Sequence, residues 1–229
     1  MLETGQMEPI AFIQSDFPTK FGIPRQSGLV EQLQARVVFA PKYRQEEALR
    51  GIEGFSHLWL IWEFSKAKRS EWSATVRPPR LGGNQRMGVF ATRSPFRPNP
   101  IGLSCVRLVA VDLHTPQGPI LHVAGADLMD GTPILDIKPY VPYADCKPMA
   151  TAGFAPPPDR AALAVDISRD LLQRIPEGKW EALKGVLAQD PRPSYQDDPE
   201  RVYGMAFAGM EIRFQVEGER LTVLAVEKP

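Results

Sequence analysis

Prolines spread along the whole chain restrict what it can fold into. The 229 residues include 23 prolines, about twice the roughly 5% that is usual in proteins. They punctuate the chain instead of forming one low-complexity tract. Each proline fixes φ and lacks a backbone N–H, which disfavours long helices and favours short strands with rigid connections. The sequence therefore predicts a mainly β protein.

Segments with β-type hydrophobic patterns fill the first half of the chain. Apolar and polar residues alternate over 33–39, and 56–62 is a continuous apolar run suited to a buried strand. A turn sequence at 115–119 separates two further runs and predicts a hairpin. The expected strands in this half are 10–13, 33–39, 56–62, 87–92, 104–113 and 120–126. Many short strands with few helices favour a barrel or sandwich over a doubly wound sheet.

The second half of the chain has a different pattern. Residues 146–160 are rich in small residues and include a Pro-Pro-Pro run, which indicates a linker. Beyond the linker we expect a strand at 163–167, helices at 169–175 and 177–189, and β-type runs at 202–216 and 221–226. The predicted fold class is therefore α+β, mainly β with some α. We expect a barrel domain over 1–145, a linker over 146–160 and a smaller α+β domain over 161–229.

The net charge excludes no class of binding partner, whereas the two cysteines argue against disulfide-rich and zinc-binding architectures. The chain has 27 basic and 27 acidic residues, so its net charge argues neither for nor against a nucleic acid. Cys105 and Cys146 lie far apart and form no CxxC or Cys/His cluster, so we expect neither a disulfide framework nor a metal site. We also expect a cytoplasmic protein without a membrane segment, because the chain contains no run of eighteen apolar residues.

An acid-free window with many arginines is the clearest functional signal. No Asp or Glu occurs between Trp72 and Val111. The same window contains no lysine but six arginines, namely Arg77, Arg80, Arg86, Arg93, Arg97 and Arg107. The guanidinium group suits phosphate and carboxylate ligands, so the window predicts a surface that binds an anion or a nucleic acid. The alternative is a solvated basic face balanced by acids that fold nearby.

Three stiff polar loops are candidates for the ligand site itself. The loop at 92–104 contains three prolines together with Arg93, Arg97 and Asn99, although it could also be a structural crossover. A second loop, at 21–26, places an arginine and an amide after a proline. The third, at 130–133, precedes an extended run in which Asp136 and Lys138 share one face. A simple salt bridge is an equally good explanation of that pair.

Standard catalytic motifs are missing from the sequence. It contains no GxGxxG, GxxxxGK[ST], HExxH or GxSxG pattern. The three histidines, His57, His114 and His122, lie in apolar or hairpin contexts and are better explained as structural. From the residues alone, the prediction ends at a β-rich domain with an arginine-lined, proline-stiffened site.

The loops, taken in order, resemble the TsaA-like family of TrmO-type tRNA methyltransferases. The resemblance covers nearly the whole chain. It rests on FGIPRQSGL at 21–29, GIEGFSHLW at 51–59, VRPPRLGGNQRMGVFATRSPFRPNPIGLS at 76–104, DLMDGTPILDIKPYVPY at 127–143, LAQDPRPSY at 187–195 and RVY at 201–203.

The resemblance implies a small β-barrel that binds S-adenosylmethionine, a homodimer, and a smaller C-terminal domain that helps to hold tRNA. The implied reaction is N6-methylation of N6-threonylcarbamoyladenosine at position 37 of threonine tRNAs, beside the anticodon. By motif position, the residues implied to bind the cofactor are Pro24, Arg25, Gln26, Ser27, Gly28, Ser65, Lys66, Arg93, Leu103, Asp130, Gly131, Thr132 and Pro133.

The chemistry of that reaction suggests further roles. A base must remove the proton of the methylated nitrogen, or an arginine must stabilise the anion that forms. Our catalytic candidates are Arg93 for the anion, and Asp136 and Tyr140 for proton handling. The modified base carries a carboxylate and lies in a single-stranded loop, where arginines and aromatic residues are suitable partners. The residues expected to bind tRNA are Arg86, Phe96, Arg97, Asn99, Lys138, Arg192 and Tyr195.

Two alternatives stay open at this point. The barrel could be a non-catalytic module that senses S-adenosylmethionine or another nucleotide. In the C-terminal loop, Arg192 could pair only with Asp197 or Asp198, and Tyr195 could serve only in packing.

Overall fold

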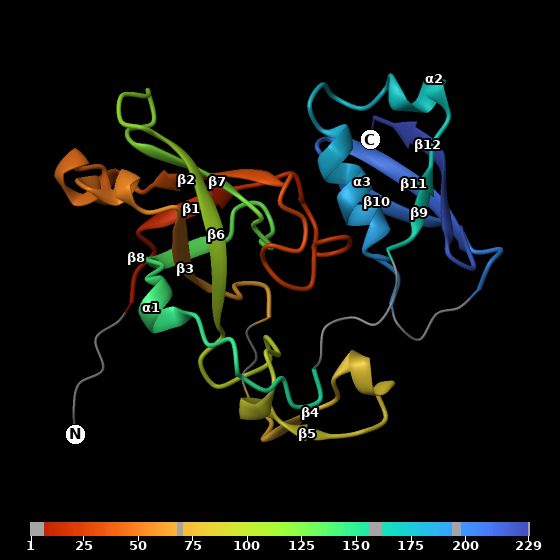
Figure 1. Cartoon of the computed structure of the whole chain (residues 1–229), viewed down its shortest axis with the longest axis horizontal. Helices are drawn as coiled ribbons and strands as arrows, with labels where there is room; N and C mark the ends of the chain where they lie inside the picture. Colours follow the sequence, from red (N-terminus) through yellow and green to blue (C-terminus); the bar gives the residue numbers. More distant parts are fainter. Residues whose placement is uncertain (1–6, 68–70, 156–161, 194–197, 229) are drawn as a thin grey trace.

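A computed structural model describes residues 7–67, 71–155, 162–193 and 198–228 (Figure 1). It confirms the mainly β fold class with some helix. The chain forms a closed six-stranded barrel, a four-stranded C-terminal sheet and a two-stranded ribbon. Within the described residues, no helix has the length and apolar character needed to cross a membrane.

The barrel is antiparallel throughout, and its interior is the first hydrophobic core. The strand order is β1 (Ala11–Gln14), β2 (Gln34–Phe39), β7 (Ile120–Ala124), β6 (Ile101–Asp112), β3 (His57–Glu63) and β8 (Pro133–Pro139). The run predicted as a buried strand at 56–62 is β3, whose alternate side chains Leu58, Leu60 and Trp62 point into this core. The predicted hairpin at 115–119 joins β6 to β7.

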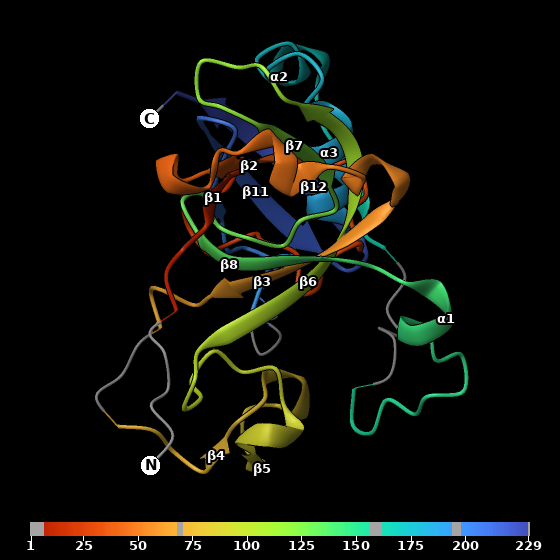
Figure 2. The same ribbon diagram turned by 90° about the vertical axis from the view of Figure 1, so that its left-hand side faces the viewer.

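Two details of the predicted strands were wrong. Only Met87–Gly88 of the run at 87–92 is a strand (β5), paired with β4 (Thr75–Val76) in the ribbon that both views show below the barrel (Figure 2). The 3₁₀ turn η5 (Val89–Ala91) follows, because the Thr92 hydroxyl and N–H both bind the Val89 carbonyl. Conversely, β6 begins at Ile101, so the stiff loop ends at its last proline.

The connections between the barrel strands contain short helices. The 3₁₀ helices are η1 (Pro41–Tyr43), η2 (Glu46–Leu49), η3 (Ile52–Gly54) and η4 (Pro79–Leu81). The helix α1 (Pro142–Asp145) follows the barrel directly.

The C-terminal part is a sheet covered by helices. Its strand order is β10 (Tyr203–Phe207), β11 (Met210–Glu217), β12 (Arg220–Glu227) and β9 (Ala164–Asp166), and its helices are α2 (Arg169–Leu172) and α3 (Trp180–Ala188). The run predicted as one strand at 202–216 is a hairpin instead. Its turn lies at Ala208 and Gly209, whose φ values are 50° and 75°.

The segment between β1 and β2 joins the two parts through a second hydrophobic core. Phe17 is 1% exposed and meets the ring of Phe207 at a centroid distance of 5.3 Å. Val30 and Leu33 belong to the same core, which otherwise consists of C-terminal residues. The Ala208 N–H also donates to the Asp16 carbonyl at 2.9 Å. The loop that contains residues 24–28 is therefore anchored on the C-terminal sheet, beside the barrel (Figure 1).

Candidate active site

The barrel topology brings the predicted ligand loops to one end. Because neighbouring strands are antiparallel, β1, β7 and β3 end where β2, β8 and β6 begin. The connecting segments at this end are 15–33, 64–100 and 125–132. They contain the predicted cofactor positions except Leu103 and Pro133, which lie in the first residues of β6 and β8. We call this end of the barrel the mouth.

Residues 26–28 lie at the mouth, where Gln26 contacts Arg93. The Arg93 guanidinium donates a hydrogen bond to the side-chain oxygen of Gln26. The Ser27 hydroxyl accepts from the Cys105 N–H at 3.1 Å, at the point where β6 extends beyond its partner β7. The Gly28 N–H donates to the Gly125 carbonyl at 2.8 Å. The loop is thus fastened to β6 and to the segment after β7.

The turn at 130–133 is held rigidly against the end of β1. The Asp130 carboxylate accepts from the Ser15 N–H at 3.0 Å, and the Gly131 N–H donates to the Ile13 carbonyl at 2.9 Å. The Thr132 hydroxyl is used internally, because it donates to the Met129 carbonyl at 2.7 Å. Asp130 and Gly131 are the exposed residues of this turn, and the φ of Gly131 is 72°.

Asp127 is the main residue that the sequence analysis missed. Its Oδ1 accepts a hydrogen bond of 2.5 Å from the Ser104 hydroxyl. Ser104 is fully buried and in turn accepts from Trp62 Nε1 at 2.9 Å. Gly102 makes room for this arrangement, since a Cβ there would lie 2.3 Å from the Trp62 ring. We call Trp62, Ser104 and Asp127 the buried network; it leads from the barrel interior to the mouth.

The environment of Asp127 raises the pKa of its carboxyl above the ordinary value. Burial is the main cause, because it disfavours the charged form. The Ser104 hydroxyl, the charge of Arg93 and the Ser27 backbone act in the opposite direction and only partly compensate. A partly buried carboxylate with a raised pKa beside an arginine is typical of a proton-accepting group. Asp127 is also an acid from outside the arginine window that folds against Arg93.

The remaining mouth positions lie at the ends of β3 and β6. The Ser65 N–H donates to the Glu63 carbonyl at 2.8 Å, which turns the chain sharply before Lys66. Leu103 is 53% exposed and pairs with Ile61 across β6 and β3. Contact of these three residues with a ligand remains a prediction.

Several predicted tRNA contacts also stabilise the protein itself. Arg97 donates to the Thr92 carbonyl at 3.0 Å, and Arg86 donates to Thr75 Oγ1 at 2.9 Å on the ribbon. The Asn99 carbonyl accepts from the Ile101 N–H at 2.7 Å, whereas Phe96 is 39% exposed. Their role in binding tRNA remains a prediction.

Asp136, Lys138 and Tyr140 lie apart from the mouth within this chain. Asp136 and Lys138 form the simple salt bridge considered as an alternative, at 3.0 Å on the outer wall. Tyr140 follows β8 at the opposite end of the barrel, where its ring meets those of His57 and Trp59. Desolvation, and next the neighbouring Cys146, raises the pKa of the Tyr140 phenol. A role of Asp136 and Tyr140 in proton transfer remains a prediction.

In the C-terminal loop, Arg192 has a structural partner other than those considered. It is 7% exposed, and its guanidinium binds Asp190 through two hydrogen bonds of 2.8 and 3.0 Å. Burial argues against a phosphate contact by this side chain. Tyr195 and Asp197 lie outside the described residues.

Two charged residues at the mouth are complementary to the charged groups of S-adenosylmethionine. Arg93 could bind its carboxylate, and the Asp127 carboxylate could face its positively charged groups. A Cβ built at Gly28 or Gly131 would meet no heavy atom within 4 Å, so both loops leave open space. The described residues contain no group of three or more His, Cys, Asp or Glu side chains that could hold a metal ion.

These features define a class of protein, a closed β-barrel with charged and glycine-containing loops gathered at one mouth. Residues 12–146 match the tRNA-methyltransferase O N-terminal domain, and residues 161–229 match the TrmO C-terminal domain. The chain belongs to the TrmO family, as its loops predicted.

Individual relatives agree with this assignment along the whole chain. The tRNA (adenine(37)-N6)-methyltransferase of Escherichia coli strain K12 is 42% identical over 230 residues, which cover 97% of each chain. A putative S-adenosylmethionine-dependent methyltransferase of Pseudomonas aeruginosa, RcsF, is 42% identical over 92% of each chain. Two crystal structures of TrmO from Pseudomonas aeruginosa align with TM-scores of 0.78, at 38% and 35% identity. They cover 100% and 97% of this chain, and 99% and 98% of theirs.

Proposed function

We propose that this chain is an S-adenosylmethionine-dependent tRNA (adenine37-N6)-methyltransferase that methylates N6-threonylcarbamoyladenosine in threonine tRNAs. The observation that carries the proposal is the meeting of residues 26–28, Arg93 and Asp127 at one mouth of the barrel. When bound, S-adenosylmethionine supplies the methyl group, and its sulfur leaves as a neutral thioether while the new N–C bond forms. Because this is an in-line displacement, positioning by rigid loops supplies much of the catalysis.

The target nitrogen needs a proton acceptor, and Asp127 is the best placed one. The N6 nitrogen lies between an adenine ring and a carbamoyl carbonyl, so its proton is more acidic than that of a simple amine. Asp127 accepts this proton at its carboxylate, while Ser104 keeps that carboxylate in place. The pKa of Asp127, raised by burial, brings its basicity closer to the working pH.

Arginines at the mouth complement the negative charge of the substrate. The threonine part of the modified base ends in a carboxylate, for which Arg93 and Arg97 are suitable partners. Arg93 also stabilises negative charge that develops on the base as the proton leaves. Gln26 keeps its guanidinium at the mouth through their hydrogen bond.

The domain roles, assembly and location are also part of the proposal. We assign cofactor binding to residues 1–145, a linker to 146–160 and tRNA binding to 161–229. We further infer a homodimer in the cytoplasm. Exposed apolar side chains such as Phe90, 74% exposed, and Leu103, 53% exposed, are suited to a partner surface.

Radiolabelled S-adenosylmethionine and total tRNA that lacks this methylation provide the direct test. We expect label to enter tRNA, and digestion to nucleosides should find it on N6-threonylcarbamoyladenosine. Arg93→Ala should reduce kcat/KM at least tenfold, or about 1.4 kcal/mol of transition-state stabilisation. Binding of the cofactor without any transfer would instead support a sensor module, and an unchanged kcat/KM would remove Arg93 from the site.

A further inference from the structure

A groove with several charged side chains lies on the outer wall of the barrel and begins beside the mouth. It has a volume of about 520 Å³ and is lined by residues of β1, β2, β6 and β7, by Ser15 and Asp16 after β1, and by Lys179, the residue before α3. Gln14, Arg36 and His122 are neighbours across β1, β2 and β7 in this wall. Leu121 and Val123 point into the barrel core, so His122 between them points outward. The groove thus connects the barrel wall with the C-terminal part.

Arg36 is the cation of this groove that has no carboxylate partner among the described residues. Lys179 pairs with Asp16 at 2.8 Å, and His122 pairs with Asp112 at 2.7 Å. Arg36 donates only to the side-chain oxygen of Gln117, at 3.3 Å. Its Nε is buried and has no hydrogen-bond partner among the described residues, so this atom faces the protein. A guanidinium whose charge is not neutralised by a carboxylate is suited to an external anion.

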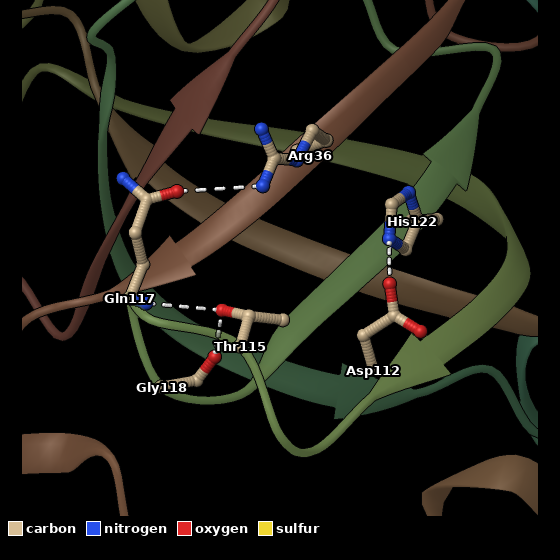
Figure 3. Close-up of polar contacts among 6 residues, drawn as sticks. All are labelled: Arg36, Asp112, Thr115, Gln117, Gly118 and His122. Atoms are coloured by element: carbon tan, nitrogen blue, oxygen red, sulfur yellow. Dashed lines mark hydrogen bonds and ion pairs between the residues drawn. The ribbon is translucent and has the colours of Figure 1, made fainter.

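The turn after β6 fixes the one contact that Arg36 makes. The Thr115 hydroxyl donates to the Gly118 carbonyl at 2.6 Å and accepts from the Gln117 N–H at 3.1 Å. Figure 3 shows Gln117 reaching from this turn to one end of the guanidinium, while His122 turns toward Asp112. A neutral amide therefore orients Arg36 without neutralising its charge.

We propose that this groove binds a backbone phosphate of the tRNA substrate, with Arg36 as the principal ligand. A guanidinium carries a fixed positive charge and several N–H donors, which suit phosphate oxygens. Gln14 and Gln34 mark the end of the groove nearest the mouth, and Asp112 lies near its other end. When the target base enters the mouth, the adjoining stem must extend along the protein surface, and this groove offers it a path. The proposal rests on tRNA being the substrate.

Two sets of variants test the groove by independent routes. Arg36→Gln removes the charge, and Arg36→Lys keeps it without the guanidinium. Val109→Glu adds a negative charge at a lining side chain that is 45% exposed, with Val109→Gln as its uncharged match. Arg50→Gln is the control, because it removes an exposed arginine that does not line the groove. Binding of unmodified and N6-threonylcarbamoyl-modified tRNA is measured by fluorescence anisotropy over a range of salt concentrations.

We expect Arg36→Gln to weaken tRNA binding about tenfold and to reduce the slope of log K against log salt by about 0.7–0.9. Arg36→Lys should restore the slope but only part of the affinity. Val109→Glu should weaken binding relative to Val109→Gln. S-adenosylmethionine affinity, measured by calorimetry, should not change in these variants, which also shows that they are folded.

Other outcomes overturn the inference. If Arg36→Gln and Val109→Glu both bind tRNA as Arg50→Gln does, while the wild-type protein still methylates tRNA, the groove proposal fails and the proposed function stands. If inorganic phosphate occupies the groove without affecting tRNA binding, the site is one for a free anion. If the wild-type protein neither binds nor methylates tRNA, both proposals fail.

Discussion

Replacing Ser104 by alanine tests the buried network most directly. The Ser104 hydroxyl joins Trp62 Nε1 to the Asp127 carboxylate at 2.9 and 2.5 Å, and the residue is 0% exposed. Ser104→Ala would leave the Trp62 N–H without an acceptor, at about 1–3 kcal/mol, and would remove a hydrogen bond to a carboxylate worth about 1.5–3 kcal/mol. Alanine also avoids the desolvation of a buried hydroxyl, which offsets part of this loss. We therefore expect the free energy of unfolding to fall by about 3 kcal/mol.

Urea unfolding measures this loss, and calorimetry should show the melting temperature reduced by roughly 6–12 °C for a protein of this size. In a Trp62→Phe background, the same serine change should cost less, because no indole N–H is left unpaired. Ser73→Ala is the matched control. The Ser73 hydroxyl also donates to a carbonyl, that of Thr75 at 2.8 Å, but it is exposed, so its loss should change stability by less than about 0.5 kcal/mol. A Ser104→Ala protein as stable as this control would refute the reasoning.

The other predictions concern two charged residues, Asp127 at the mouth and Arg192 in the C-terminal part. Asp127→Asn should lower kcat at least about 100-fold, the usual contribution of a general base. Burial raises the pKa of Asp127, so ionisation lowers native-state stability as pH rises from about 4 upward. The asparagine variant avoids this loss, and its unfolding free energy at pH 8 should equal or exceed that of the wild type; full activity would exclude Asp127 as the base. Arg192→Ala should lower the free energy of unfolding by roughly 3 kcal/mol, because it removes both hydrogen bonds between the buried guanidinium and the Asp190 carboxylate. An unchanged melting temperature with weaker tRNA binding would show that this guanidinium serves RNA.

The barrel was predictable because its strands follow local rules. The alternation at 33–39 and the hairpin turn at 115–119 appear in the structure as β2 and the β6–β7 connection. The failures were also local. Hydrophobicity alone does not predict that Thr92 forms hydrogen bonds that end a turn after β5. Nor does it predict that Ala208 adopts a φ of 50°, in the turn that divides the predicted run at 202–216 into two strands.

The mouth was predictable only in part, for a different physical reason. Gln26 and Arg93 were identified from loop motifs, and they do meet. Asp127 was not singled out, because its significance depends on Ser104 and on burial, which only the closed barrel creates. The signal that could have revealed it is an acidic residue directly after an apolar run, beside a glycine-rich turn. Asp136 was chosen instead, although its register places it on the outer wall.

The anchoring of Phe17 and Leu33 in the C-terminal core has a consequence for biosynthesis. A ribosome releases the barrel strands first, long before the residues of β10 and β11 that cover these side chains. During that interval, apolar side chains remain exposed to solvent on the segment of the nascent chain that contains Gln26. We therefore expect chaperones to bind this segment. The loop that contains residues 24–28 should adopt its final structure only after β10 and β11 have been translated.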